Sequence, residues 1–168
     1  KEFKSLKIIF TGENSMTGGR VLKLKKYLKN EDSFFMTYGD GITNINLKKL
    51  FNFHKKNNKI ATVTAVRPPV KFGELEIDKK SMVKSFIEKP QVQKGWINGG
   101  FFILNKKIFN YIKNSSTVFE SEPLSKLSKN KQLIAYKHKG YWKCMDNLNE
   151  KKQLEQIYKQ NKSVWNIK

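Results

Sequence analysis

The feature that most constrains the fold is an apolar and aromatic run at residues 34–38, which leads into Gly39-Asp40-Gly41. A run with so little polar interruption suits a strand covered on both faces, as in an α/β sheet. Glycines on either side of Asp40 let the backbone bend sharply. Open α/β sheets bind ligands at the carboxyl ends of their strands, where Asp40 would lie. Two interpretations are open: a metal-binding carboxylate, or a plain Asp-Gly turn.

Strand and helix patterns alternate along the rest of the chain. Strand patterns occupy residues 6–10, 60–66, 100–104, 133–136 and 141–145, and residues 72–78 and 82–88 read as an antiparallel hairpin. Helical patterns follow Thr17 and Asn46 as caps, pass through residues 108–112, begin near Pro123 and close the chain at residues 148–158. The alternation predicts a three-layer α/β fold, with a mainly parallel mixed sheet and helices on both faces, in one domain over residues 1–168.

The composition raises the question of a nucleic-acid partner, because the formal net charge is +20. All but Arg20 and Arg67 of the 34 basic residues are lysines, and these are scattered along the chain. Arginine is the residue that reads bases bidentately, so a solvated lysine surface is favoured over a nucleic-acid site. The chain shows no apolar run of membrane-spanning length and no secretory signal, and its single cysteine, Cys144, fits a reducing cytoplasm.

A second carboxylate, Asp146, repeats the setting of Asp40, since it follows a strand pattern and precedes a helix. Each aspartate taken singly fits a helix N-cap or a turn. Together they fit Mg²⁺, which takes one or two carboxylates and completes its shell with water and phosphate oxygens. The spacing does not show whether the two converge.

Three further positions have a functional and a structural interpretation. Arg20 follows Gly18 and Gly19 in a first helical turn, where free N–H groups would attract an anion, or it simply faces solvent. Lys89 precedes the rigid Pro90 at a strand end, a weak signal taken alone. Asn98-Gly99-Gly100 either lets a substrate approach the backbone or forms a turn. His54 and His138 lack metal-ligand spacing and are expected to be structural or solvated.

Six motifs in order resemble the sugar nucleotidyltransferases, in particular the branch of the glucose-1-phosphate cytidylyltransferases. The segments are residues 11–20 (TGENSMTGGR), 38–41 (YGDG), 72–73 (FG), 86–90 (FIEKP), 97–102 (INGGFF) and 142–146 (WKCMD). The resemblance implies the Rossmann-like nucleotide-diphospho-sugar transferase fold and, for the full-length protein, a homo-oligomer. It also implies CTP and glucose 1-phosphate as substrates and CDP-glucose and pyrophosphate as products, used for dideoxysugars of cell-surface polysaccharides such as O-antigen.

The resemblance also implies roles for individual residues. It makes Asp40 and Asp146 the Mg²⁺ ligands. It places Ser15, Arg20 and Gly39 at the nucleotide and product site, and it assigns glucose 1-phosphate to Gly73, Glu88, Lys89 and Asn98, with Lys89 on the phosphate. Arg20 and Lys89 then act with the aspartates in catalysis, through an attack of the sugar phosphate on the α-phosphorus of CTP.

The sequence departs from this family at its start. The Gly-rich loop that cradles the triphosphate in family members, and the lysine after it, have no counterpart in residues 1–168. We therefore expect the chain to be the C-terminal two-thirds of a longer enzyme, and to bind CTP poorly when isolated. Two alternatives stay open: a sugar nucleotidyltransferase of other base or sugar specificity, and a noncatalytic basic module that binds nucleic acid or another polyanion.

Overall fold

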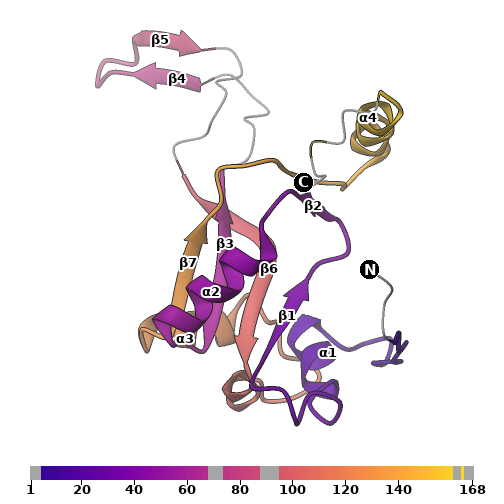
Figure 1. Cartoon of the computed structure of the whole chain (residues 1–168). Helices are drawn as coiled ribbons and strands as arrows, with labels where there is room; N and C mark the ends of the chain where they lie inside the picture. Colours follow the sequence, from indigo (N-terminus) through magenta and orange to yellow (C-terminus); the bar gives the residue numbers. More distant parts are fainter. Residues whose placement is uncertain (1–4, 68–73, 88–94, 161–163, 165–168) are drawn as a thin grey trace.

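The computed structural model describes residues 5–67, 74–87, 95–160 and 164 (Figure 1). Four α-helices, one 3-10 helix and eight strands lie in these ranges. In chain order they are α1 (Thr17–Lys23), β1 (Ser33–Thr37), β2 (Gly41–Thr43), α2 (Leu47–Asn57), β3 (Ala61–Val66), β4 (Glu74–Ile77), β5 (Val83–Ile87), β6 (Ile97–Asn105), η1 (Lys106–Tyr111), α3 (Glu122–Lys129), β7 (Leu133–Lys137), β8 (Trp142–Cys144) and α4 (Leu148–Lys159). Among the described residues, no helix is long and apolar enough to cross a membrane.

The main sheet has four strands in the order β1-β6-β3-β7. Strand β6 runs antiparallel to both of its neighbours, whereas β3 and β7 are parallel. Strands β1, β3 and β7 therefore point in one direction and β6 in the other. The predicted mixed sheet is confirmed, and the carboxyl ends of β1, β3 and β7 meet at one edge, together with the start of β6.

Helices cover both faces of this sheet. Alternate residues of β6 point to opposite faces and contact different helices. Phe102 and Leu104 join a core with residues of α1, η1 and α3, while Ile103 packs with Leu50 of α2 on the other face. The three-layer prediction is confirmed. His54 is a buried structural histidine, as expected: its Nδ1 lies 2.8 Å from the hydroxyl of Thr62, and burial lowers its pKa.

Two small sheets complete the fold. Strands β4 and β5 form the predicted antiparallel hairpin, which lies away from the main sheet in Figure 1. Strands β2 and β8 pair antiparallel over three residues each. The prediction of a strand at residues 141–145 is thus confirmed in its centre, whereas β2 was not predicted.

Two local predictions near the N-terminus are wrong. Residues 5–10 form no strand, and Leu6, Ile8 and Phe10 are 84%, 93% and 81% exposed. The alternation of these residues suits a strand, but a strand requires a partner, and none pairs with this segment among the described residues. Thr17 does not cap α1; the cap position is Met16, and the Thr17 hydroxyl instead donates to Glu120. The helix predicted through residues 108–112 is present as the 3-10 helix η1, Lys106–Tyr111, which ends before Ile112.

Candidate functional site

Asp40 lies in the turn between β1 and β2, on an exposed part of the surface. The backbone turns at Gly39 and Asp40, as expected, but neither flanking glycine has a φ in the left-handed region, so the turn uses no conformation that is special to glycine. A Cβ on Gly41 would come within 3.3 Å of the Phe101 ring, so that position is kept small by packing. A Cβ on Gly39 would meet no atom within 4 Å. Gly39 therefore leaves open space beside the carboxylate.

Strand pairing brings Asp146 to the same place. Gly41 of β2 is in register with Cys144 of β8, and the backbone N–H of Met145 donates to the carbonyl oxygen of Asp40 over 2.9 Å. Both aspartates are exposed at one end of this small sheet. The convergence that the spacing alone did not show is therefore present at the level of the backbone.

The alternative that Asp146 is a helix cap is wrong. Asn147 caps α4, with its side chain accepting from the N–H of Glu150 over 3.0 Å. The N–H of Asp146 donates to the Glu150 carboxylate over 2.7 Å, and the thiol of Cys144 donates to Oδ2 of Asp146 over 3.1 Å. One ligand atom from each of Cys144, Asp146 and Glu150 lies within 4.8 Å of the others. A thiol is a soft ligand, so a hard cation such as Mg²⁺ fits the carboxylates of Asp40 and Asp146 rather than this trio.

Ser15 and Arg20 converge on Thr11 in the loop before α1. The buried Ser15 hydroxyl donates to the Thr11 carbonyl oxygen, and Nη1 of the exposed Arg20 donates to the Thr11 hydroxyl over 2.9 Å. Nη2 also reaches the carbonyl oxygen of Glu13 at 3.4 Å. The guanidinium is thereby oriented on the surface and keeps further N–H donors for a ligand.

The expectation of free N–H groups in the first turn of α1 is wrong. The N–H groups of Gly18 and Gly19 donate to the carbonyl oxygen of Thr117 over 2.9 and 3.2 Å. A Cβ on Gly19 would lie 2.1 Å from the carbonyl oxygen of Ser115. The Gly-Gly pair therefore permits close backbone packing, and any attraction for an anion at this position comes from the Arg20 side chain.

Glu120 connects these regions and was missed in the sequence. One of its carboxylate oxygens accepts from the Tyr38 hydroxyl over 2.6 Å, and the other accepts from the Thr17 hydroxyl over 2.6 Å. Thr17 precedes Arg20 by three residues, and Tyr38 precedes Asp40 by two. Partial burial and the bond to Glu120 raise the pKa of the Tyr38 phenol. The only local signal was an acidic residue directly after the buried Phe119, which does not reveal such distant partners.

Asn98-Gly99-Gly100 is neither a turn nor an open backbone, because it lies inside β6. The Asn98 amide donates to the Tyr38 hydroxyl over 3.2 Å and accepts from the N–H of Gly100 over 2.9 Å. A Cβ would lie 2.8 Å from Val66 at Gly99 and 2.7 Å from the Tyr38 ring at Gly100. Close packing therefore requires both glycines, and Asn98 is the member of this segment whose side chain reaches the surface.

Three predicted site residues, Gly73, Glu88 and Lys89, lie outside the described residues, so their roles stay predictions. They flank the β4–β5 hairpin in sequence, with Gly73 directly before β4 and Glu88 directly after β5. The described part of the candidate site thus consists of the Asp40–Asp146 pair with Gly39, the Thr11 loop with Ser15 and Arg20, Asn98, and Glu120, which contacts Tyr38 and Thr17.

Comparison with known proteins identifies the family of this chain. The family model described as nucleotidyl transferase matches residues 1–151. The glucose-1-phosphate cytidylyltransferase of Salmonella typhimurium is 42% identical over 158 residues, which are 94% of this chain and 61% of that protein. A Bacillus subtilis protein described as probable glucose-1-phosphate cytidylyltransferase is 40% identical over the same shares. The chain thus spans about three-fifths of the length of these relatives.

The fold is similar to that of HddC from Yersinia pseudotuberculosis, solved in complex with GMP-PN. The TM-score is 0.65 at 24% sequence identity, over 89% of this chain and 65% of HddC. At this identity the likeness concerns the fold alone. Because the family model matches residues 1–151, we conclude that the chain belongs to the nucleotidyl transferase family.

Proposed function

We propose that this chain is the sugar-phosphate and metal-binding part of a glucose-1-phosphate cytidylyltransferase. The reaction joins CTP and glucose 1-phosphate into CDP-glucose and releases pyrophosphate. The single observation that carries the base and the sugar is the 42% identity with the Salmonella typhimurium cytidylyltransferase over 94% of this chain. The proposal also includes that the full-length protein is a homo-oligomer and that it is cytoplasmic.

The described residues support a division of labour at this site. Asp40 and Asp146 offer exposed carboxylates just outside one end of the paired strands β2 and β8, a donor set that fits Mg²⁺. Mg²⁺ held there would neutralise charge on the phosphates and orient them. The oriented guanidinium of Arg20 would bind phosphate oxygens bidentately. Gly39 would let a nucleotide approach the backbone next to Asp40, because the space beside it is open.

The proposed step is a displacement at the α-phosphorus of CTP. A phosphate oxygen of glucose 1-phosphate forms the new P–O bond, and the bond to the pyrophosphate leaving group breaks. Lys89 would hold the sugar phosphate, and Glu88, Gly73 and Asn98 would hold the glucose. Such a reaction needs positioning and charge neutralisation, and no covalent enzyme intermediate.

Glu120 would act as a positioning residue for this reaction. Its two short hydrogen bonds hold Tyr38, next to the Gly39-Asp40 turn, and Thr17, the first residue of the helix α1 that carries Arg20. The carboxylate thereby fixes the proposed metal ligand relative to the proposed phosphate contact.

The test is a pyrophosphate-release assay on a chimaera in which residues 1–168 follow the N-terminal segment of the Salmonella typhimurium relative. We expect Mg²⁺-dependent release with CTP and glucose 1-phosphate, and less with GTP, UTP or dTTP. A preference for another nucleotide in this panel would contradict the cytidylyl assignment. The intact Salmonella typhimurium enzyme, assayed in parallel, is the positive control. The isolated chain should bind CTP poorly, and micromolar binding with turnover would refute that expectation.

Three aspartate variants separate the metal site from general charge effects. Asp40→Asn and Asp146→Asn should each abolish turnover while leaving the thermal midpoint nearly unchanged. Asp32→Asn is the matched control, because Asp32 is an exposed aspartate just before β1, whereas Asp40 follows that strand. Full activity in both site variants would overturn the proposed metal ligands, and loss of activity in the control would show that the effect is not specific.

A further inference from the structure

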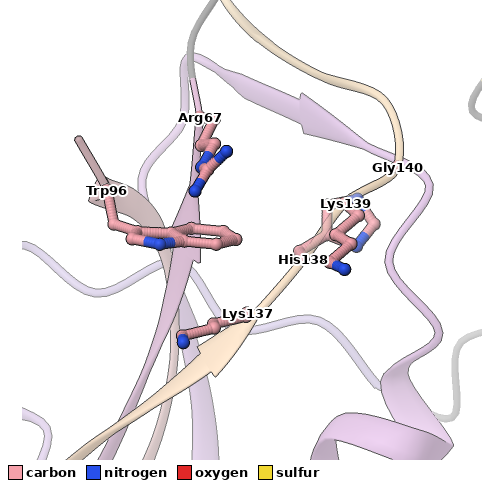
Figure 2. Close-up of a pocket in the computed structure, with 6 residues that line it drawn as sticks. All are labelled: Arg67, Trp96, Lys137, His138, Lys139 and Gly140. Carbon is pink, nitrogen blue, oxygen red and sulfur yellow. The ribbon is translucent and has the colours of Figure 1, made fainter. Parts of the chain in front are cut away.

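A cavity of about 510 Å³ lies at the end of the main sheet where β3 and β7 end and β6 begins. The described residues that line it are Arg67, Trp96, Lys137, His138, Lys139 and Gly140. They come from three different segments, as Figure 2 shows. The volume lies in the range of small-molecule sites. None of these residues has a role in the proposed transfer reaction.

The charge of the lining has one sign. Arg67, Lys137 and Lys139 are cationic, His138 is titratable, and no carboxylate is among the described lining residues. The ion pairs found among the described residues do not include these side chains. Several cations around one concave surface create a positive potential that favours a ligand with more than one negative charge.

The indole of Trp96 organises two of these cations. The Arg67 guanidinium carbon lies 4.7 Å from the ring centroid and the Lys137 ammonium nitrogen lies 5.6 Å from it. In Figure 2 the guanidinium lies above the ring and the ammonium below it. Both faces of the indole are thus occupied, so the ring is not available to stack on a nucleobase or a sugar. The stacked guanidinium keeps its charge and its edge donors, since a cation–π contact does not neutralise it.

The other side of the cavity is held by the segment after β7. The N–H of His138 donates to the Ala65 carbonyl oxygen over 2.9 Å, and its Nε2 lies 3.2 Å from the Thr43 hydroxyl and from the Tyr141 carbonyl oxygen. A carbonyl oxygen only accepts, so Nε2 is the protonated nitrogen where it bonds to Tyr141. A Cβ on Gly140 would lie 2.7 Å from the His138 ring, which shows how closely this segment packs.

We propose that this cavity is a second anion site, which binds the phosphate group of a small phosphorylated molecule through Arg67, Lys137 and Lys139. Phosphate fits better than a single carboxylate, because a guanidinium fork matches its oxygens and the two lysines add point charges for a doubly charged group. A free pyrophosphate and the phosphate of a phosphosugar share this chemistry. The site uses residues distinct from Asp40, Asp146 and Arg20.

The test is calorimetric titration of the chain with inorganic phosphate, pyrophosphate and glucose 1-phosphate, each without Mg²⁺ and at constant ionic strength. We expect saturable binding of at least one of the three, with quenching of tryptophan fluorescence that is absent in Trp96→Phe. Loss of one charge-assisted contact should weaken affinity about ten-fold in Arg67→Gln and in Lys137→Gln. The three titrants distinguish inorganic anions from a phosphosugar as the ligand.

Lys139→Gln and its control Lys129→Gln separate the loss of a contact in the cavity from the loss of one positive charge anywhere on the surface. Lys139 lines the cavity, and Lys129 lies at the end of α3, before β7 begins and hence at the opposite end of that strand. We expect weaker binding in Lys139→Gln and unchanged binding in Lys129→Gln. Absence of saturable binding, or an equal loss in Lys129→Gln, would overturn the proposal and leave only nonspecific attraction to a chain of net charge +20. Glucose 1-phosphate binding that is unchanged in all the cavity variants would belong to the site proposed for the transfer reaction, and the nucleotide assay with Mg²⁺ tests that site separately.

Discussion

Gly100 packs against the Tyr38 ring and Gly39 follows Tyr38 in the sequence, and alanine should destabilise the fold at Gly100 but not at Gly39. Gly100 has a φ of +75°, and a Cβ there would lie 2.7 Å from Cδ2 and 3.4 Å from Cγ of Tyr38. An L-residue in the left-handed region costs about 1–2 kcal/mol, and overpacking against a ring costs about 1–3 kcal/mol. The less flexible unfolded chain offsets about 0.4–1 kcal/mol. We expect Gly100→Ala to lose about 3 kcal/mol of unfolding free energy.

Gly39→Ala is the matched control, because its φ lies outside the left-handed region and its Cβ would enter open space. We expect its unfolding free energy to stay within about 1 kcal/mol of the parent chain. For a chain of this size, about 3 kcal/mol corresponds to a fall of about 10 °C in Tm. Thermal and urea unfolding followed by circular dichroism measure both variants. Equal midpoints in the two variants would refute the packing argument.

The same pair separates stability from binding. If a nucleotide occupies the space beside Gly39, Gly39→Ala should weaken its binding in the chimaera while the midpoint is unchanged. Gly100→Ala should instead lower the midpoint and displace the Tyr38 ring, which carries the hydrogen bond to Glu120.

Three further outcomes follow from burial and ionisation. The pKa of the Tyr38 phenol is raised above its ordinary value near 10, so the stability that the neutral phenol contributes is complete below that pH and is lost as the pH rises above it. In urea unfolding, the free energy of unfolding should fall less between about pH 8 and about pH 11 in Tyr38→Phe than in the parent chain. Hydrogen bonds from Lys113 and Lys126 lower the pKa of Glu122 to about 2 from its ordinary value of 4.5. The stability that the ionised carboxylate contributes is therefore present above pH 4.5 and is lost as the pH falls toward about 2. NMR titration should show a higher pKa for Glu122 in Lys126→Ala. Phe119→Ala should lower the unfolding free energy by about 3–5 kcal/mol, because the ring is fully buried. Phe10→Ala, at an 81% exposed position, should change it by less than about 0.5 kcal/mol. A large loss of stability in Phe10→Ala would mean that the segment around Phe10 packs in solution.

Features fixed by neighbouring residues could be predicted from the sequence. The cap at Asn46 is confirmed because a side chain and an N–H three residues apart decide it. The strand at residues 60–66 is confirmed as β3, since β-branched residues suit a strand whose positions are mostly buried. The segment at residues 6–10 has an equally good local pattern, yet it forms no strand, because pairing depends on a partner elsewhere.

Features of the site that depend on distant contacts could not be predicted in the same way. Thr17 satisfies the pattern of a cap, but its hydroxyl lies within reach of Glu120, which only the folded chain brings close. Asp146 satisfies that pattern too, but Asn147 next to it takes the role, a choice between neighbours that composition does not decide. The family motifs identified Asp40 and Asp146 as a pair, and the register of two three-residue strands supplies the physical reason for their proximity.

The Asn98-Gly99-Gly100 segment of β6 makes hydrogen bonds to the residues that lead to both proposed metal ligands. Gly100 accepts a hydrogen bond from the N–H of Tyr38 over 3.2 Å, and Asn98 donates to the Tyr38 hydroxyl, so this segment holds the strand that leads to Asp40. The carbonyl oxygen of Gly99 accepts from the indole N–H of Trp142 over 2.8 Å, so the same segment holds the strand that leads to Asp146. A Cβ at Gly100 would collide with the Tyr38 ring, and a Cβ at Gly99 would collide with Val66 of β3. The distance between the two aspartates is therefore set by β6 as well as by the pairing of β2 with β8, and a substitution in this segment alters the proposed metal site without touching either carboxylate.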